Sequence, residues 1–243
     1  MSAHYGAFCT DHYVNLKLGL KLELAQGRET VLSLFERIRR QYPGMTEFRK
    51  YKDELALESP TQETPHRWVA VRSGSVRSGV VNPGESCEAN RLHETVLEVS
   101  PYYLSISPLD VDFVEVLFGF DIAAGGNHDE LVADTLFGGS LLAGLFEAGE
   151  GRAIDCQPVI GIALTDNTEA YFEVKTRAAA GRRGQGDEPI SVYLTLRTHG
   201  PIDDLKELAG VFQGLVAHGE ELVESLVLPI LVNPIRNGIV PGM

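Results

Sequence analysis

The sequence predicts an α+β fold in which one unit occurs twice, with a mainly antiparallel sheet and helices packed on one face of it. The first observation is the stretch 13–24, YVNLKLGLKLEL, in which apolar and polar residues alternate. Strict alternation is typical of a strand with one buried and one solvated face. The second observation is a similar stretch at 114–122, with Gly119 in the place of Gly19. We therefore expect an internal duplication of a β-α-β-β-β-α unit.

The two units occupy residues 1–108 and 109–243, and we expect them to fuse into one globular domain. In the first unit the strand is followed by a helix, because apolar residues recur at helical spacing over 31–42 until Pro43 stops the pattern. A strand that ends at a loop is expected within 46–59. The remaining predicted elements are a hairpin of strands 67–71 and 76–81 and a helix over 86–103.

The second unit repeats this order after its own first strand, 111–122. Asn127 and Glu130 supply the N-cap and the third-position acid of a capping box, so a helix begins there. The insertion 178–189 is rich in Gly, Arg and acidic residues and predicts a mobile hairpin tip. The apolar tail after Pro229 needs a place to pack, and it is a candidate homodimer contact. The other predicted elements are a short helical turn at 141–146, strands 159–164, 171–175 and 190–197, and a helix over 202–227 that Pro229 ends or kinks.

Composition excludes several classes of function. The formal net charge of -13 argues against a nonspecific nucleic-acid binder, because neutralising phosphates needs a surplus of Lys and Arg. The cysteines Cys9, Cys87 and Cys156 have neither a disulfide nor a metal-ligand spacing, so no metal is expected. No apolar stretch is long enough to span a membrane, and the N-terminal residues do not resemble a signal peptide. We therefore expect a cytoplasmic protein.

The element order, with Trp68 opening the first hairpin and VEVLFGF at 114–120 opening the second unit, resembles an uncharacterised, sporadically distributed bacterial family. It also resembles the duplicated gyrase-inhibitor-like effector-binding domains, whose two halves enclose a groove for a small molecule. Chlorite-dismutase-like proteins are similar in length and in having two α+β halves, and that resemblance implies haem. No haem-ligand signature surrounds His93 or His218, so no cofactor is expected.

Aromatic and basic residues on matching strands are the candidate ligand-binding residues. Rings on a sheet form walls that an apolar ligand or a protein partner meets, and cations pair with carboxylates or phosphates. The alternative is packing of the rings in the core and cross-strand pairing of the cations with surface acids. Alternation places Arg67 and Arg77 on one face and Arg72 on the other, so the arginines are not expected to form one patch. The candidates are Trp68, Arg72, Phe118, Tyr171 and Lys175.

A second candidate site is a cluster of acidic residues and histidine. Asp110 and Asp112 lie at the start of the repeated strand, and His128 and Asp129 lie at the start of the next helix. Such groups bind metal ions or act as acids and bases when they lie close together. The alternative is a solvated strand end and a helix cap. Cys87 at a helix start is a weaker candidate nucleophile, because Glu85 and Glu88 oppose its ionisation, and the helical His93 and His218 are expected on helix surfaces.

No catalytic motif emerges from these patterns, so no catalytic residue is assigned. We predict a non-catalytic binding protein that recognises a small ligand or a protein partner at the junction of the two units, since ligand sites favour such junctions. Two alternatives remain. One is an enzyme that uses the acid and histidine cluster or a bound cofactor, and the other is a structural subunit of a larger assembly.

Overall fold

The computed structural model describes residues 5–24, 27–146, 152–176 and 188–239. It confirms an α+β fold built on one antiparallel sheet of nine strands, in the order β2-β3-β4-β5-β1-β6-β9-β8-β7. Most of the insertion predicted as a mobile hairpin tip lies outside the described residues. The strands are β1 (Asp11–Leu20), β2 (Glu47–Tyr51), β3 (Glu54–Glu58), β4 (His66–Arg72), β5 (Ser75–Val81), β6 (Val111–Ile122), β7 (Val159–Ala163), β8 (Thr168–Lys175) and β9 (Ile190–His199).

The helices follow the predicted pattern with some changes of boundary. The main ones are α1 (Arg28–Gln41), α2 (Ser86–Leu104) and α5 (Glu207–Leu222), and α5 continues through a π-helical segment, η4 (Val223–Val232), into α6 (Asn233–Gly238). The shorter ones are η1 (Tyr5–Ala7), η2 (Pro108–Asp110), α3 (His128–Val132), η3 (Ala133–Phe137) and α4 (Ala143–Phe146). None of the described helices is both long and apolar enough to cross a membrane.

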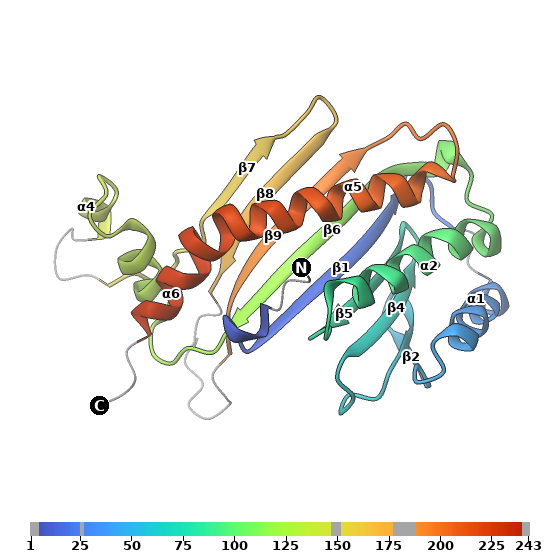
Figure 1. The fold of residues 1–243 in the computed structure, drawn as a ribbon, viewed down its shortest axis with the longest axis horizontal. Coiled ribbons are helices and arrows are strands. Elements are labelled where there is room, and N and C mark those ends of the chain that lie inside the picture. The colour runs from blue at the N-terminus through green and yellow to red at the C-terminus, as the bar shows by residue number, and fades with distance from the viewer. Residues whose placement is uncertain (1–4, 25–26, 147–151, 177–187, 240–243) are drawn as a thin grey trace.

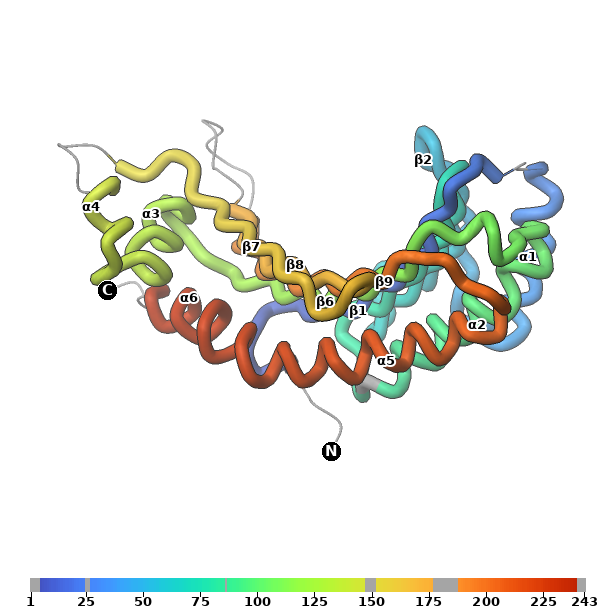
Figure 2. Tube along the Cα trace, turned by 90° about the horizontal axis from the view of Figure 1, so that it is seen from above, coloured from blue at the N-terminus to red at the C-terminus, as the bar shows by residue number. Residues whose placement is uncertain are grey.

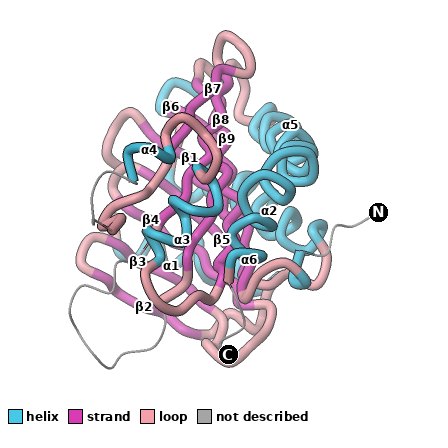
Figure 3. Tube along the Cα trace, turned by 90° about the vertical axis from the view of Figure 1, so that its left-hand side faces the viewer, coloured by secondary structure: helices cyan, strands magenta, loops and turns pink. Residues whose placement is uncertain are grey.

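Alternation along the central strands decides which face of the sheet is covered. Val14, Leu16 and Leu18 of β1 are buried, while the residues between them are partly exposed. Figure 2 shows the sheet curved, with α2, α5 and α6 on its convex side and no described helix over the middle of the concave side. The end-on view in Figure 3 shows the same arrangement of one strand layer and one main helix layer. The hydrophobic core therefore lies between the convex side and these helices.

The two halves of the chain meet at β1 and β6 in the middle of the sheet (Figure 1). In this antiparallel pair Leu16 lies opposite Val116, the residue one hundred positions later. Outward from β1 the strands are β5, β4, β3 and β2, and outward from β6 they are β9, β8 and β7. In each half, the last strand of the sequence therefore lies next to the first. The first half has four strands between its two helices where the sequence predicted three, because residues 46–59 form a hairpin of β2 and β3. The duplication itself stays a prediction.

His93 lies in the core, although the sequence predicted it on a helix surface. Its side chain is fully buried between α2 and the sheet. The Val14 carbonyl only accepts, so His93 Nε2 donates to it at 3.1 Å, and Nδ1 accepts from the Ser78 hydroxyl at 2.8 Å. Its ring packs edge to face against Phe212 of α5, with centroids 5.6 Å apart. Burial lowers the pKa of His93 from 6.5 to about 3, so the ring is neutral near pH 7.

The C-terminal tail packs within its own chain. Pro229 was expected to end or kink the long helix, but it lies inside η4. In this π-helical segment the α-helical hydrogen bonds, one of which proline cannot donate, are replaced by bonds between residues five positions apart. Beyond it, Val232 and Ile235 are completely buried. These residues belong to the core of the monomer, so nothing supports the tail as a homodimer contact.

Candidate functional site

The concave side of the sheet, called the open face below, is formed by the side chains that alternate with the buried ones. The strand registers place side chains from six strands in one cross-strand row at its centre. This row crosses the boundary between the two halves of the chain, which is where the sequence predicted a binding surface. In order, the row contains Trp68, Gly79, Asn15, Leu117, Thr195 and Tyr171.

Aromatic rings on the open face lie flat over glycines of the neighbouring strand. A Cβ built on each of these glycines would stand 2.2 to 2.8 Å from the nearest ring atom, far inside van der Waals contact. Glycine is therefore the residue that leaves room for each ring. The directly opposed pairs are Phe113 over Gly19, Trp68 over Gly79, Tyr13 over Gly119 and Tyr171 over Gly161.

Cationic side chains lie over several of these rings. Lys17 Nζ is 5.0 Å and the Arg197 guanidinium 4.4 Å from the centroid of Phe113. The Arg77 guanidinium lies 5.8 Å from the centroid of Trp68. A cation over a ring face is attracted by the quadrupole of the ring. Each of these side chains is thereby held close to the sheet.

Arg77 and Arg197, together with Arg72, are paired with carboxylates that are largely buried. Arg197 donates to Glu115 through Nε at 2.9 Å. Arg72 donates to Glu54 at 2.8 Å, and Arg77 forms a further ion pair with the same carboxylate. Burial lowers the pKa of Arg77 below its usual range. The open face therefore carries fixed positive and negative groups among its rings.

Four of the five predicted ligand-binding residues lie on the open face, namely Trp68, Arg72, Tyr171 and Lys175. Trp68 and Tyr171 share the central row, but five strand spacings, or about 24 Å, separate them. They therefore belong to one surface and not to one pocket. Arg72 and Arg77 were expected on opposite faces, yet both contact Glu54, because alternation within one strand does not carry across a hairpin.

Phe118 lies on the other side of the sheet from these four residues. It is 2% exposed and packs against Gly219 of α5, where a Cβ would stand 2.2 Å from its ring. Alternation along β6 puts Phe118 on the same side as Val116 and Phe120, both buried in the core. The expectation that Phe118 faces a ligand is corrected, because the ring is part of the helix-covered core.

The predicted acid and histidine cluster is not formed. Asp110 and Asp112 lie at one end of β6 and His128 and Asp129 beyond the other, and β6 has twelve residues, or about 40 Å of strand. Within the described chain no group of three or more His, Cys, Asp or Glu side chains is placed to hold a metal ion. The expectation of one cluster is therefore corrected.

Three of the four members of that cluster, Asp110, His128 and Asp129, have a structural role instead. Asp110 accepts hydrogen bonds from the backbone and hydroxyl of Ser107 at 2.8 and 2.7 Å, which lowers the pKa of its carboxyl. His128 Nε2 donates to the Ala124 carbonyl at 2.8 Å. The buried Asp129 accepts from the Cys156 backbone at 2.9 Å and from the Thr176 hydroxyl, and so ties two segments to the start of α3.

The Glu85 carboxylate opposes activation of Cys87 as a nucleophile, and its effect exceeds that of the nearby Arg91 cation. The Cys87 thiol donates to the Glu85 carboxylate at 3.3 Å, and this bond raises the pKa of the exposed thiol. The neutral thiol is the weaker nucleophile. The structure therefore gives no chemical role to this residue.

Sequence reasoning missed several residues of the open face. Phe113 and Arg197 contact each other on the two central strands of the second half, and Tyr13 and Tyr193 approach each other with centroids 6.3 Å apart. The available signal was an aromatic residue or glycine at a solvent-facing position of an alternating strand. Such a residue indicates a ring that lies over a glycine only when the neighbouring strand is known. The order of the strands follows from the fold and not from a local pattern.

Comparisons with known proteins do not place the chain in a family. No protein-family model and no curated protein matches it. Among solved structures, one match is the di-domain ARO/CYC BexL from the BE-7585A biosynthetic pathway. The match has 8% sequence identity, covers 78% of this chain and 77% of that chain, and has a TM-score of 0.21. A likeness this weak carries no argument about the present chain.

Proposed function

We propose that this chain is a non-catalytic binding protein that holds a protein partner on the open face. The observation that carries the proposal is the set of four rings held flat over glycines across both halves of the sheet. Rings fixed in this way lose little conformational freedom when a partner covers them, and Trp, Tyr and Arg are the residues that dominate protein interfaces. The surface is therefore organised in advance for contact.

The dimensions of the open face favour a protein over a small molecule. The central row extends for about 24 Å between Trp68 and Tyr171, wider than a pocket that encloses a small ligand. The fixed ion pairs around Glu54 and Glu115 add polar contacts of both signs beside this row. A partner with alternating charges and exposed apolar side chains would complement such a surface.

A site-specific photo-crosslinker tests this proposal. p-Benzoylphenylalanine is placed at Thr195, in the middle of the open face, and separately at Ala217, an exposed position on α5. We expect one protein from the native cell extract to be captured from position 195 and not from position 217. Capture alone does not suffice, so the captured protein is then purified and titrated.

The titration compares a variant of the open face with a control variant on α2. Trp68→Ala with Tyr171→Ala should weaken binding at least about tenfold, since truncating aromatic anchors at an interface typically costs 2 kcal/mol or more. Tyr102→Ala, on the exposed surface of α2, should leave the affinity unchanged. Equal affinity of all variants, or equal capture from both crosslinker positions, would show that the open face is not the binding surface.

A second observation favours assembly as a further function. Of the thirteen large hydrophobic residues described as exposed, seven lie between Leu141 and Ile162. Three of them, Val159, Ile160 and Ile162, belong to β7, which among the described strands is an edge strand paired with β8 and contains no charged residue. Unprotected apolar edge strands pair readily with another chain. We infer that β7 pairs with β7 of a second copy, because an uncharged strand avoids repulsion between two chains of net charge -13.

The oligomeric mass tests this assembly. In an antiparallel pair centred on Gly161, Ile160 of one copy lies opposite Ile162 of the other. Sedimentation velocity should show a dimer for the unmodified chain and a monomer for Ile160→Lys, which places a charge on this edge. Leu109→Lys changes another exposed residue, far from β7, and should remain dimeric. A monomeric unmodified chain, or a dimeric Ile160→Lys variant, would overturn the inference.

A further inference from the structure

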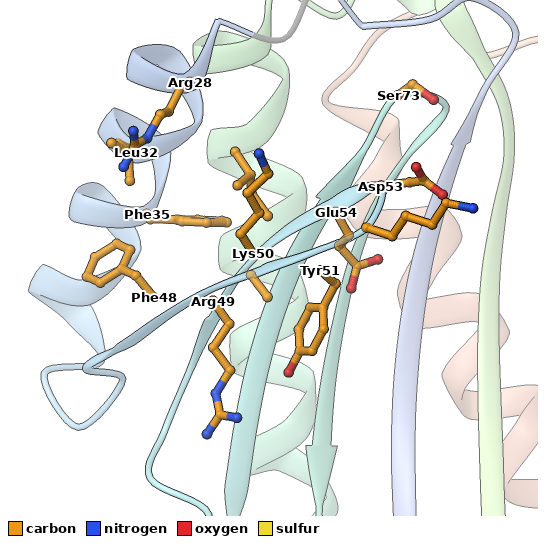
Figure 4. Close-up of a pocket in the computed structure, with 13 residues that line it drawn as sticks. Arg28, Leu32, Phe35, Phe48, Arg49, Lys50, Tyr51, Asp53, Glu54 and Ser73 are labelled. Atoms are coloured by element: carbon orange, nitrogen blue, oxygen red, sulfur yellow. The ribbon is translucent and has the colours of Figure 1, made fainter.

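A cavity of about 610 Å³ lies between α1 and the β2–β3 hairpin, at the end of the sheet opposite β7. Figure 4 shows Leu32 and Phe35 reaching from α1 toward Lys50, while Arg49 and Tyr51 point to the other side of β2. The volume is within the range of cavities that hold small organic ligands. The cavity is distinct from the central row of the open face.

The floor of this cavity is apolar. Phe35 is almost completely buried, and its ring lies 6.2 Å from that of Phe48, which is 40% exposed. Leu32 and Leu55 contribute aliphatic surface beside them. An apolar ligand placed here would remove the exposed part of Phe48 from water, and burial of apolar surface is favourable.

The rim of the cavity is positively charged. Arg28, Lys50 and Lys52 line it, and within the described part of the chain none of the three forms an ion pair or a side-chain hydrogen bond. Two carboxylates also line the cavity. Glu54 is engaged by Arg72 and Arg77, which leaves Asp53 as the unpaired acid. Unpaired cations thus outnumber unpaired acids in a chain whose net charge is -13.

We propose that this cavity binds an organic anion with an apolar body, such as a carboxylate on an aliphatic chain. The apolar part would lie on Phe35 and Phe48, and the charged group would lie among Lys50, Lys52 and Arg28. The two features select together, because the floor provides affinity without regard to charge and the rim rejects cations. A cation of the same length loses the favourable electrostatic contacts and meets repulsion from the rim.

Isothermal titration calorimetry with two matched probes tests the proposal. Decanoate and decyltrimethylammonium share one aliphatic chain and carry opposite charges, and both are used below their micellar concentrations. We expect decanoate to bind at one site with a Kd tighter than about 1 mM, and decyltrimethylammonium to bind at least about tenfold more weakly. Equal binding of the two probes, or no binding of decanoate at about 1 mM, would overturn the proposal.

Variants then locate the site. Lys50→Glu with Lys52→Glu should weaken decanoate binding at least about tenfold, because two attractive contacts become repulsive. Lys206→Glu is the control for charge reversal, since this exposed lysine precedes α5 far from the cavity.

Phe48→Ala should weaken the binding of decanoate more than that of hexanoate, whose shorter chain covers less of the floor. Unchanged decanoate binding in the double lysine variant, with a native circular dichroism spectrum, would place the anion elsewhere. The outcome is independent of the open face, whose central residues none of these substitutions changes.

Discussion

The two faces of β6 differ although they are built from one strand. On the side covered by α5, Val114, Val116 and Phe118 are buried, and their contacts are close-packed. On the open side, Phe113 and Glu115 alternate with them and contact cations of neighbouring strands. The covered face is stabilised by burial of its side chains against helices. The open face is stabilised by contacts between side chains of neighbouring strands.

Glycine shows what this difference means. A glycine inside a strand weakens the strand, because it adds backbone entropy to the unfolded chain and has no side chain to pack. Gly19, Gly79 and Gly119 nevertheless belong to three central strands, and each lies under an aromatic ring. The open face is therefore shaped by the fit of rings to the sheet and not by the need to cover a core.

The comparison predicts unequal consequences for two phenylalanines of the same strand. Phe118→Ala should lower the free energy of unfolding by ~3–5 kcal/mol, since it removes a fully buried ring beneath α5. Phe113→Ala removes a partly exposed ring and should lower it by about 1 kcal/mol. Urea denaturation followed by circular dichroism measures both. Similar losses for the two variants would show that the open face is as much a core as the covered one.

A pH titration sharpens the description of the covered face. The unfolded His93 binds a proton below its ordinary pKa of 6.5, whereas the folded residue does so only near 3. The unfolded state therefore takes up more protons in this interval, so stability falls as the pH is lowered from about 6.5 to 3, by up to about 1.4 kcal/mol per pH unit. Above pH 6.5 this residue contributes no pH dependence.

The variant His93→Gln separates this effect from other titrating groups. Its amide nitrogen keeps a donor for the Val14 carbonyl, but the side chain does not titrate. We expect a less stable protein at pH 7 and a shallower loss of stability between pH 6.5 and 3 than in the unmodified chain. His218→Gln, at an exposed position on α5, is the control and should leave the slope unchanged. An identical slope in all three proteins would rule out His93 as its source.

Local patterns predicted the elements and one face of the sheet. Alternation over β1 and β6 identified the central strands and their buried residues, and helical spacing identified α1. These properties depend on residues near one another in the chain. The π-helical segment through Pro229 was not predictable in this way, because it depends on how Val232 and Ile235 pack into the core.

The candidate site was predictable only in part, because it depends on strand pairing. Trp68 and Tyr171 were identified as aromatic strand residues, but their common row follows from registers that join five strand pairs. Asp112 and His128 seemed close because a strand and a turn separate them in sequence, whereas the extended strand places them far apart. The number of residues between two positions therefore does not give the distance between them in the folded chain.

Substitution of a glycine beneath a ring tests directly why the open face contains glycines. In Gly79→Ala the new Cβ would stand 2.3 Å from the Trp68 ring and from Asn15 Oδ1, so the ring must move and the free energy of unfolding should fall by about 1–2 kcal/mol. Gly74→Ala is the matched control, because nothing lies within 4 Å of its Cβ. It should be neutral or slightly stabilising, since alanine reduces the entropy of the unfolded chain.

Trp68 is the single tryptophan of the chain, so its fluorescence reports the movement of the ring independently of stability. A Gly79→Ala variant with unchanged emission and unchanged stability would mean that the ring is not held by the glycine, and the open face would then lack the rigidity that a preorganised binding surface requires.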